Sequence, residues 1–189
     1  MVGLPVVAVV GRSGVGKTSF LERLVPALRA RGLAVGCVKH ASHGFLADRP
    51  GKDSYRLAAS GADAVALASR HQIATFRSAV VPPELEVPLV AALATLPRDL
   101  DLVLAEGFSW EPVARLVLVA RGDEPSPDYL RAGPVIAVVE VPPHPEQSAP
   151  LFAPALVARI ARRLAARARA RARAASRPTP LAPRRQDLH

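Results

Sequence analysis

The chain is short of several residue types, and each shortage excludes a class of protein. It has one cysteine, Cys37, so no internal disulfide can form, and the strand-like surroundings of this thiol predict that it packs in the core. Half of the 189 residues are apolar, yet no segment approaches the ~20 consecutive apolar residues of a membrane span. The first apolar run follows no basic region or cleavage site typical of a secretory signal. We therefore expect a cytoplasmic protein that does not enter a membrane.

Asparagine is absent and lysine is rare. Without asparagine the chain cannot contain N-K-x-D, the motif with which many GTPases read guanine, so the residues leave the choice between ATP and GTP open. Only three of the 25 basic residues are lysines: Lys17, Lys39 and Lys52. Lysine is a compact point charge and arginine a planar fork, so the two are not interchangeable at a crowded phosphate. We expect all three lysines to serve one site.

The net charge of +9 is a property of the C-terminal end alone. Residues 1–150 carry 15 basic and 15 acidic residues, whereas residues 151–189 carry ten arginines and one acid. This end has no aromatic residue for stacking on bases beyond Phe152, so an Ala/Arg-rich solvated helix is favoured over a nucleic-acid interface. We expect a domain over residues 1–168 and an Arg/Pro-rich tail, disordered or a frayed helix, over 169–189.

The strongest motif is G-R-S-G-V-G-K-T at residues 11–18, which matches the phosphate-binding P-loop. It lies between a β-branched apolar run and a segment with helical apolar spacing, the context that this motif requires. Backbone N–H groups of such a loop point into one concavity at a helix N-terminus and bind anions. Lys17 is expected to reach the β- and γ-phosphates and Thr18 to ligate Mg²⁺. The residues predicted to hold the nucleotide in this stretch are Gly11, Ser13, Gly14, Val15, Gly16, Lys17, Thr18 and Ser19.

Strands and helices are expected to alternate along the chain. The pattern predicts strands at about 5–10, 34–39, 102–105, 115–120 and 134–139, and helices at about 17–31, 53–60 and 83–96, with a last helix from near residue 152. Either of two short apolar runs, 63–68 and 73–76, suits a further strand. This order predicts an α/β protein, the three-layer P-loop NTPase fold with a mostly parallel central sheet flanked by helices.

Polar residues follow the predicted strands where ligands bind in such folds, outside the carboxyl ends. Glu106 follows four apolar residues, as the metal carboxylate of a Walker B segment does, and with Lys17 it is a predicted catalytic residue. Asp48 and Asp53 compete for a second role at the metal, so the predicted metal residues are Thr18, Asp48, Asp53 and Glu106. His40 and His43 suit phosphate contact, an ordinary polar loop or a transition-metal pair, although zinc needs more ligands than these.

The ordered motifs resemble those of one family. They are G-R-S-G-V-G-K-T, V-K-H-A-S-H, D-R-P-G-K-D-S-Y-R, A-A-S-G-A-D and D-L-V-L-A-E-G-F, within residues 4–140. In this order they resemble the molybdopterin-guanine dinucleotide biosynthesis accessory proteins, the MobB family of SIMIBI-type P-loop proteins. The resemblance implies a homodimer that binds GTP with Mg²⁺, hydrolyses it slowly at most and assists the guanylyltransferase that attaches GMP to molybdopterin.

The resemblance also implies site residues. It places GTP phosphates on residues 14–18, puts Asp48 or Asp53 with Glu106 on the metal side, and lines the adjacent pocket with Lys39, His40, His43 and Lys52. Molybdopterin is then a candidate bound substrate. The chain departs from the family at Ser42, where the family often has a further histidine, and at Ser109, where it often has a lysine.

Two other functions fit the P-loop. One is a P-loop kinase or an ATP-dependent enzyme resembling dethiobiotin synthetase, which also ends a strand in Glu-Gly; a kinase usually needs an Arg-rich lid, for which Arg49 and Arg56 are the candidates. The other is a nucleotide-dependent dimer that acts as a scaffold or carrier, like the metallochaperone NTPases.

Overall fold

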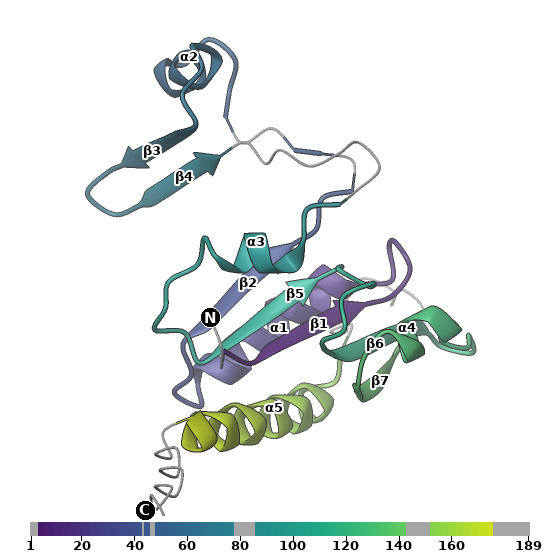
Figure 1. Ribbon diagram of the computed structural model, residues 1–189. Helices are drawn as coiled ribbons and strands as arrows, with labels where there is room; N and C mark the ends of the chain where they lie inside the picture. Colours follow the sequence, from purple (N-terminus) through teal and green to yellow (C-terminus); the bar gives the residue numbers. More distant parts are fainter. Residues whose placement is uncertain (1–3, 43, 46–47, 78–85, 143–151, 176–189) are drawn as a thin grey trace, which may run out of the picture. The chain divides into compact units, whose positions relative to one another are not determined.

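A computed structural model describes residues 4–42, 44–45, 48–77, 86–142 and 152–175 (Figure 1). Contacts divide the chain into two compact units. The first unit comprises residues 1–40 and 94–189, and the second comprises residues 41–93. No helix among the described residues is both long and apolar enough to cross a membrane.

The first unit is built on a five-stranded sheet in the order β2-β5-β1-β6-β7, and every pair of neighbours is parallel (Figure 1). The strands are β1 (Val6–Val10), β2 (Val35–Lys39), β5 (Leu102–Glu106), β6 (Ala114–Ala120) and β7 (Val135–Val141). All five predicted strands of the sheet are confirmed within two residues. A parallel sheet that is buried on both faces needs strands of continuous apolar residues, and β1, β5 and β6 have them.

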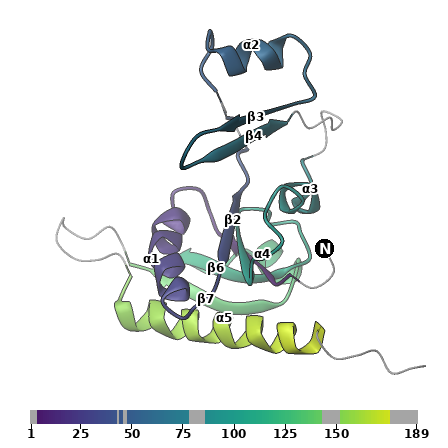
Figure 2. The ribbon, with the colours of Figure 1, turned by 90° about the vertical axis from the view of Figure 1, so that its left-hand side faces the viewer.

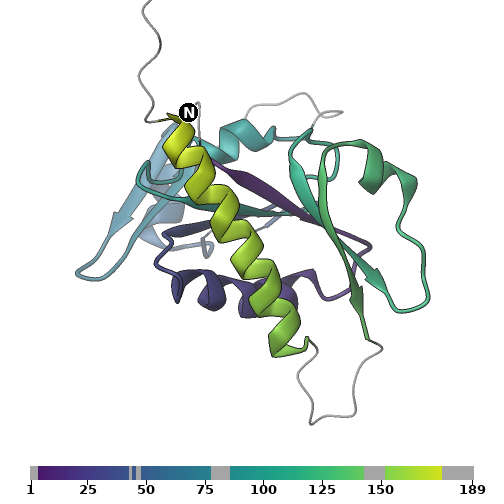
Figure 3. The same cartoon turned by 90° about the horizontal axis from the view of Figure 1, so that it is seen from below.

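One face of the sheet packs against two long helices, α1 (Lys17–Arg29) and α5 (Pro154–Ala175). The two helices are neighbours in Figures 2 and 3. Phe20 of α1 contacts Phe152, just before α5, with ring centroids 4.9 Å apart. Leu24 and Leu28 of α1 and Leu164 of α5 are fully buried in this core. The helix expected at 17–31 is thus confirmed. The last helix runs without a break across the predicted boundary at residue 168, and the division of the chain there stays a prediction.

The opposite face carries a smaller core. Ala8 and Val10 of β1 and Val117 and Val119 of β6 alternate with residues of the first core, as side chains of a strand do. They pack against Val113 and against Tyr129 of α4 (Pro127–Arg131), a short helix that the sequence did not predict. The connection from β5 to β6 on this side, residues 107–113, contains no helix.

Arg115 of β6 is fully buried on this second face of the sheet. Its side chain is bound by backbone carbonyl groups. Its guanidinium donates to the carbonyl oxygens of Ser109 at 2.9 Å, of Tyr129 at 3.4 Å and of Glu111, and its Nε donates to that of Val113 at 3.4 Å. Burial lowers the pKa of Arg115. The side chain therefore ties the β5–β6 connection and α4 to the sheet through their main chain.

The second unit contains α2 (Asp53–Ala59), α3 (Leu89–Leu93) and an antiparallel pair, β3 (Ala64–Ala68) with β4 (Ile73–Arg77). Both short apolar runs thus form strands, and they pair with each other in a sheet of their own. The helix expected at 53–60 is confirmed.

Two expectations are wrong. The helix predicted over 83–96 extends only over Leu89–Leu93 within the described residues, since Pro88 disfavours helical geometry at residue 87, and Pro97 does so at residue 96. Cys37 is exposed and not in the core, because β2 is an edge strand that has a neighbour, β5, on one side only.

Replacing Arg115 with methionine should lower the free energy of unfolding by about 2–4 kcal/mol, because several buried carbonyl groups would lose their donor. Chemical denaturation of the full chain measures this loss. Arg163→Met is the matched control, since Arg163 is exposed on α5, and we expect a change within about 0.5 kcal/mol. Equal effects of both substitutions would contradict the role assigned to Arg115.

Candidate functional site

The loop between β1 and α1 has the conformation of a phosphate cradle. Gly11 sits where a Cβ atom would lie 2.4 Å from the carbonyl oxygen of Leu118 on β6, so the close approach of the two segments requires glycine. Gly16, with φ of +93°, is the N-cap of α1 in the left-handed region, and no side chain caps the helix. The first turn of α1 therefore keeps N–H groups available to an anion.

Lys17 is folded back over this loop. Its Nζ donates to the carbonyl oxygens of Gly11 at 3.0 Å and Arg12 at 2.8 Å. Burial lowers the pKa of the Lys17 ammonium, Glu106 opposes this effect and Lys39 adds to it. The acceptors of Lys17 are neutral, so its positive charge is left for an anion bound in the loop.

Thr18, Lys39 and Glu106 meet beside the loop. The Thr18 hydroxyl is 2.9 Å from both oxygens of the Glu106 carboxylate, and the Lys39 ammonium is 2.8 Å from Glu106 Oε1 and 3.5 Å from Thr18 Oγ1. The Glu106 side chain is 11% exposed and that of Lys39 is 60% exposed. The three residues come from three neighbouring elements: the start of α1 after β1, the end of β2 and the end of β5. Polar residues that end or follow three predicted strands thus meet at one place in the first unit.

The oxygen atoms of Thr18 and Glu106 suit Mg²⁺. Magnesium prefers oxygen ligands, takes one or two protein groups and completes its octahedron with phosphates and water. No group of three or more His, Cys, Asp or Glu side chains that could hold a metal lies in the described parts of the chain. A hydroxyl and one carboxylate beside a phosphate-binding loop therefore fit a metal that arrives with a nucleotide.

An aromatic cluster borders the Lys39–Glu106 pair. The His40 ring packs edge-on against Phe108 and Trp110, with centroids 5.5 Å and 4.9 Å away. The chain reaches this position by a sharp turn, because Gly107 has φ of +86° and Phe108, a buried residue, has φ of +53°. Trp110 is 44% exposed. The turn after Glu106 is thus held by ring contacts on one side and, through Ser109 and Glu111, by Arg115 on the other.

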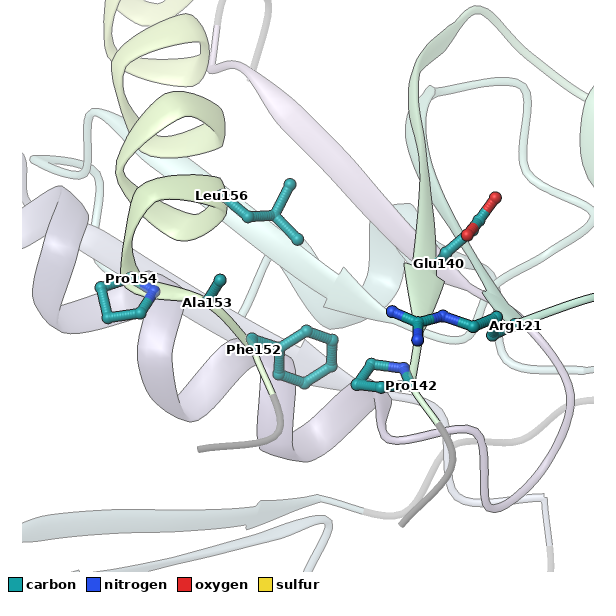
Figure 4. Close-up of a pocket in the computed structure, with 7 residues that line it drawn as sticks. All are labelled: Arg121, Glu140, Pro142, Phe152, Ala153, Pro154 and Leu156. Atoms are coloured by element: carbon teal, nitrogen blue, oxygen red, sulfur yellow. The ribbon is translucent and has the colours of Figure 1, made fainter. Parts of the chain in front are cut away.

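Two clefts lie at the carboxyl edge of the sheet. One, of about 630 Å³, borders the phosphate loop and is lined by Arg12 to Val15, the end of β6, Asp123, Glu124 and Tyr129. The other, of about 440 Å³, lies between the ends of β6 and β7 and the start of α5, where Arg121 points toward Phe152 and Pro142 (Figure 4). No residue predicted for the site lines this second cleft.

Four predicted site residues are not among the described residues of the first unit. His43 falls outside the described residues. Asp48, Lys52 and Asp53 belong to the second unit, where Lys52 is the N-cap of α2 and Asp53 forms an exposed ion pair with Arg56 at 3.7 Å. Asp48 accepts a hydrogen bond from its neighbour's N–H at 2.7 Å, and the nearby Ser54 hydroxyl, this N–H and Lys52 hold its pKa below the usual range. The roles of these four residues stay predictions.

Sequence reasoning missed Arg115 and the aromatic cluster. A single arginine inside the apolar run A-R-L-V-L-V-A was the available signal, since a charge in a buried strand needs partners. Phe108 and Trp110 gave no periodic pattern, because they lie on a connection and not on a helix or strand.

Comparison with known proteins identifies the family. The family model described as "Molybdopterin guanine dinucleotide synthesis protein B", or MobB, matches residues 6–141. The chain belongs to the MobB family. The matched range takes in the phosphate loop, Lys39 and Glu106, together with the whole second unit.

Matches to molybdopterin-guanine dinucleotide biosynthesis adapter proteins cover about two thirds of the chain or more. The molybdopterin-guanine dinucleotide biosynthesis adapter protein of Escherichia coli K12 is 39% identical over 127 residues, which are 67% of this chain and 72% of that protein. The probable adapter protein of Bacillus subtilis 168 is 32% identical over 139 residues, 71% of this chain and 75% of that protein.

Solved MobB structures have the same fold. A crystal structure of molybdopterin-guanine biosynthesis protein B is 32% identical, with a TM-score of 0.63, and the match covers 87% of this chain and 99% of that one. Bacillus subtilis MobB is 27% identical with a TM-score of 0.60, over 83% of this chain and 96% of that one. The predicted α/β architecture, a mostly parallel sheet flanked by helices, is thereby confirmed.

Replacing Gly107 with alanine should destabilise the protein more than the same change at Gly122. Both residues have a left-handed φ, +86° and +88°, but a Cβ at residue 107 would lie 3.0 Å from His40 Cβ, whereas one at residue 122 meets nothing within 4 Å. The strain of the backbone is common to both and costs about 1–2 kcal/mol. We expect the Gly107 variant to lose about 1 kcal/mol more, measured by denaturant unfolding. Equal losses would show that His40 does not press on the turn.

Proposed function

We propose that this protein is an adapter in the biosynthesis of molybdopterin-guanine dinucleotide and that it binds GTP with Mg²⁺ at the loop of residues 11–18. Family membership supports the pathway, and one observation in the structure carries the nucleotide site. This observation is the contact of Thr18 with Glu106 beside Lys17, since it brings a hydroxyl and a carboxylate to the mouth of a phosphate loop. Guanine is inferred from the family, because the residues themselves favour neither base.

Each residue has a separate task in this proposal. The N–H groups of the loop and of the first turn of α1 bind the phosphate oxygens, and Lys17 neutralises the β- and γ-phosphates. Thr18 and Glu106 would hold Mg²⁺, and the metal would supply positive charge that neutralises the terminal phosphates. Gly11, Ser13, Gly14, Val15, Gly16 and Ser19 complete the cradle, and Lys39 and His40 border it.

Hydrolysis in this proposal is slow. Both Glu106 oxygens contact the Thr18 hydroxyl, and one of them also binds Lys39. The carboxylate thus serves the metal and the lysine and is not positioned as a free base for water. GTP then acts chiefly to set the state of the adapter, and not as a rapidly consumed substrate.

The remaining assignments belong to the same proposal. Lys52 and His43 extend the binding pocket, Asp48 or Asp53 supplies a second carboxylate for the metal, and molybdopterin is the candidate second ligand. We propose a cytoplasmic homodimer whose partner is the guanylyltransferase that attaches GMP to molybdopterin.

Lys17→Ala should weaken GTP binding by about 2–5 kcal/mol, roughly 30-fold or more, because it removes the charge that faces the phosphates. Calorimetric titration measures the affinity. Arg29→Ala is the matched control, since it removes a cation from the last turn of the same helix and should leave the affinity unchanged.

The base preference and the role of the metal are measured by titrating ATP in competition with GTP, with and without Mg²⁺. Tighter binding of GTP and a gain from Mg²⁺ would support the proposal. Unchanged affinity in Lys17→Ala would refute the phosphate site. Preference for ATP, together with rapid turnover in the presence of a small acceptor, would favour the alternative of a kinase or a dethiobiotin-synthetase-like enzyme.

A pull-down experiment tests whether the guanylyltransferase is the partner. Immobilised full-length protein should retain the guanylyltransferase more strongly with GTP and Mg²⁺ than without nucleotide, and Lys17→Ala should abolish this difference, because the proposed adapter changes its partner affinity with the nucleotide. Failure to retain the enzyme under either condition would contradict the adapter role. Equal retention with and without GTP would support the partner and refute nucleotide control.

A further inference from the structure

The carboxylate proposed for Mg²⁺ already has a cation. The Lys39 ammonium lies 2.8 Å from Glu106 Oε1 and 3.5 Å from the Thr18 hydroxyl oxygen, so it contacts both groups that the metal would use. With Thr18 Oγ1 at 2.9 Å from both Glu106 oxygens, the three side chains form a closed triangle. The positive charge of Lys39 thus satisfies the site without a metal.

The Lys17 ammonium is held by different groups. It binds the carbonyl oxygens of Gly11 and Arg12, which are not proposed ligands of the metal. The two lysines of the first unit therefore differ in their contacts: Lys17 is held by neutral backbone groups, and Lys39 is held by the carboxylate proposed for the metal. Of these two, Lys39 is the one whose contacts overlap those of Mg²⁺.

We propose that Lys39 is an internal counter-cation that competes with Mg²⁺ for Glu106 and is displaced from it when Mg²⁺ and nucleotide bind. This inference deepens the proposed function and rests on the metal role of Thr18 and Glu106. Lys39 is in this view a regulator of metal occupancy and not a phosphate ligand alone.

Exposure determines which partner moves. Lys39 and Glu106 face each other in the register of β2 and β5, so the pairing of two strands fixes their backbones. The Lys39 side chain is 60% exposed and can swing toward solvent, whereas that of Glu106 is 11% exposed and is also bonded to Thr18. Two cations on one carboxylate repel each other strongly at short distances, so a metal bound by Glu106 would favour release of the ammonium.

The exchange couples the metal to the nucleotide. Mg²⁺ alone must break the Lys39–Glu106 ion pair, whereas a nucleotide brings negative charge that offers the displaced ammonium a new partner. Occupancy of the site by metal without nucleotide is thereby disfavoured. By linkage, the competition from Lys39 raises the Mg²⁺ concentration at which the metal begins to strengthen nucleotide binding.

The experiment measures that concentration in the full chain. The affinity for the non-hydrolysable β,γ-imido analogue of GTP is titrated by calorimetry over a range of Mg²⁺ concentrations in wild type and Lys39→Met. We expect the midpoint for Mg²⁺ to fall about two- to tenfold in the variant, which is the range for loss of a half-exposed ion pair. Lys39→Gln, which removes the charge but keeps a polar side chain, should show the same shift and is the second variant.

Arg23→Met is the matched control for charge. Arg23 is an exposed cation of α1 in the same unit as Lys39, and it lies outside the loop of residues 11–18. If the midpoint moves only in the Lys39 variants, direct competition is supported. If Arg23→Met shifts it equally, the effect is general electrostatics and the inference is overturned.

A second readout uses the metal without nucleotide. Mn²⁺ binding, followed by electron paramagnetic resonance, should be tighter in Lys39→Met than in wild type by a similar factor, and Glu106→Gln should remove this gain. Equal Mn²⁺ binding in wild type and Lys39→Met would overturn the inference.

Failure of this inference differs from failure of the proposed function. If wild type binds the GTP analogue with no dependence on Mg²⁺, the metal role of Thr18 and Glu106 falls, and this inference falls with it. If wild type depends on Mg²⁺ and both Lys39 variants keep its midpoint, only the competition is refuted.

Discussion

The parallel register of β2, β5 and β1 is the constraint on which the site depends. It aligns Lys39 with Glu106 across one strand pair and Glu106 with Val9 across the next, so that the three strands end at one level. The loop that follows β1 then begins α1 within reach of the Glu106 carboxylate. Hydrogen bonds of the main chain thus fix the spacing of groups that are 88 residues apart in the sequence, namely Thr18 and Glu106.

Much of this arrangement could be predicted from local patterns. The apolar runs of β1, β5 and β6 are continuous because both faces of the strands are buried. The glycine-rich segment between β1 and α1 is typical of a phosphate-binding loop. Since parallel strands share a carboxyl edge, Lys39 and Glu106 could be placed beside the loop from strand order alone. The rarity of lysine helped, because it singled out Lys39 in a chain that otherwise uses arginine.

Other features depend on tertiary contacts that no local pattern carries. Cys37 looks like a core residue until β2 is known to be an edge strand, and the segment before residue 96 has helical spacing although its prolines limit the helix to Leu89–Leu93. Arg115 needs carbonyl partners from a connection and from α4, which lie 2–14 residues away and have no periodicity. The second unit raises the same difficulty, because the roles predicted for Lys52, Asp48 and Asp53 require a long-range arrangement.

The chain contains one tryptophan, and it stands at the turn that follows Glu106. The Trp110 ring contacts His40, and His40 follows Lys39 directly in the sequence. The only indole of the protein therefore lies close to the cation that we propose to move. The tryptophan emission of the unlabelled protein therefore originates from the edge of the site and not from an average over the fold. Trp110 is thus an intrinsic fluorescence probe beside Lys39, the residue whose displacement would distinguish the nucleotide-free adapter from the nucleotide-bound one.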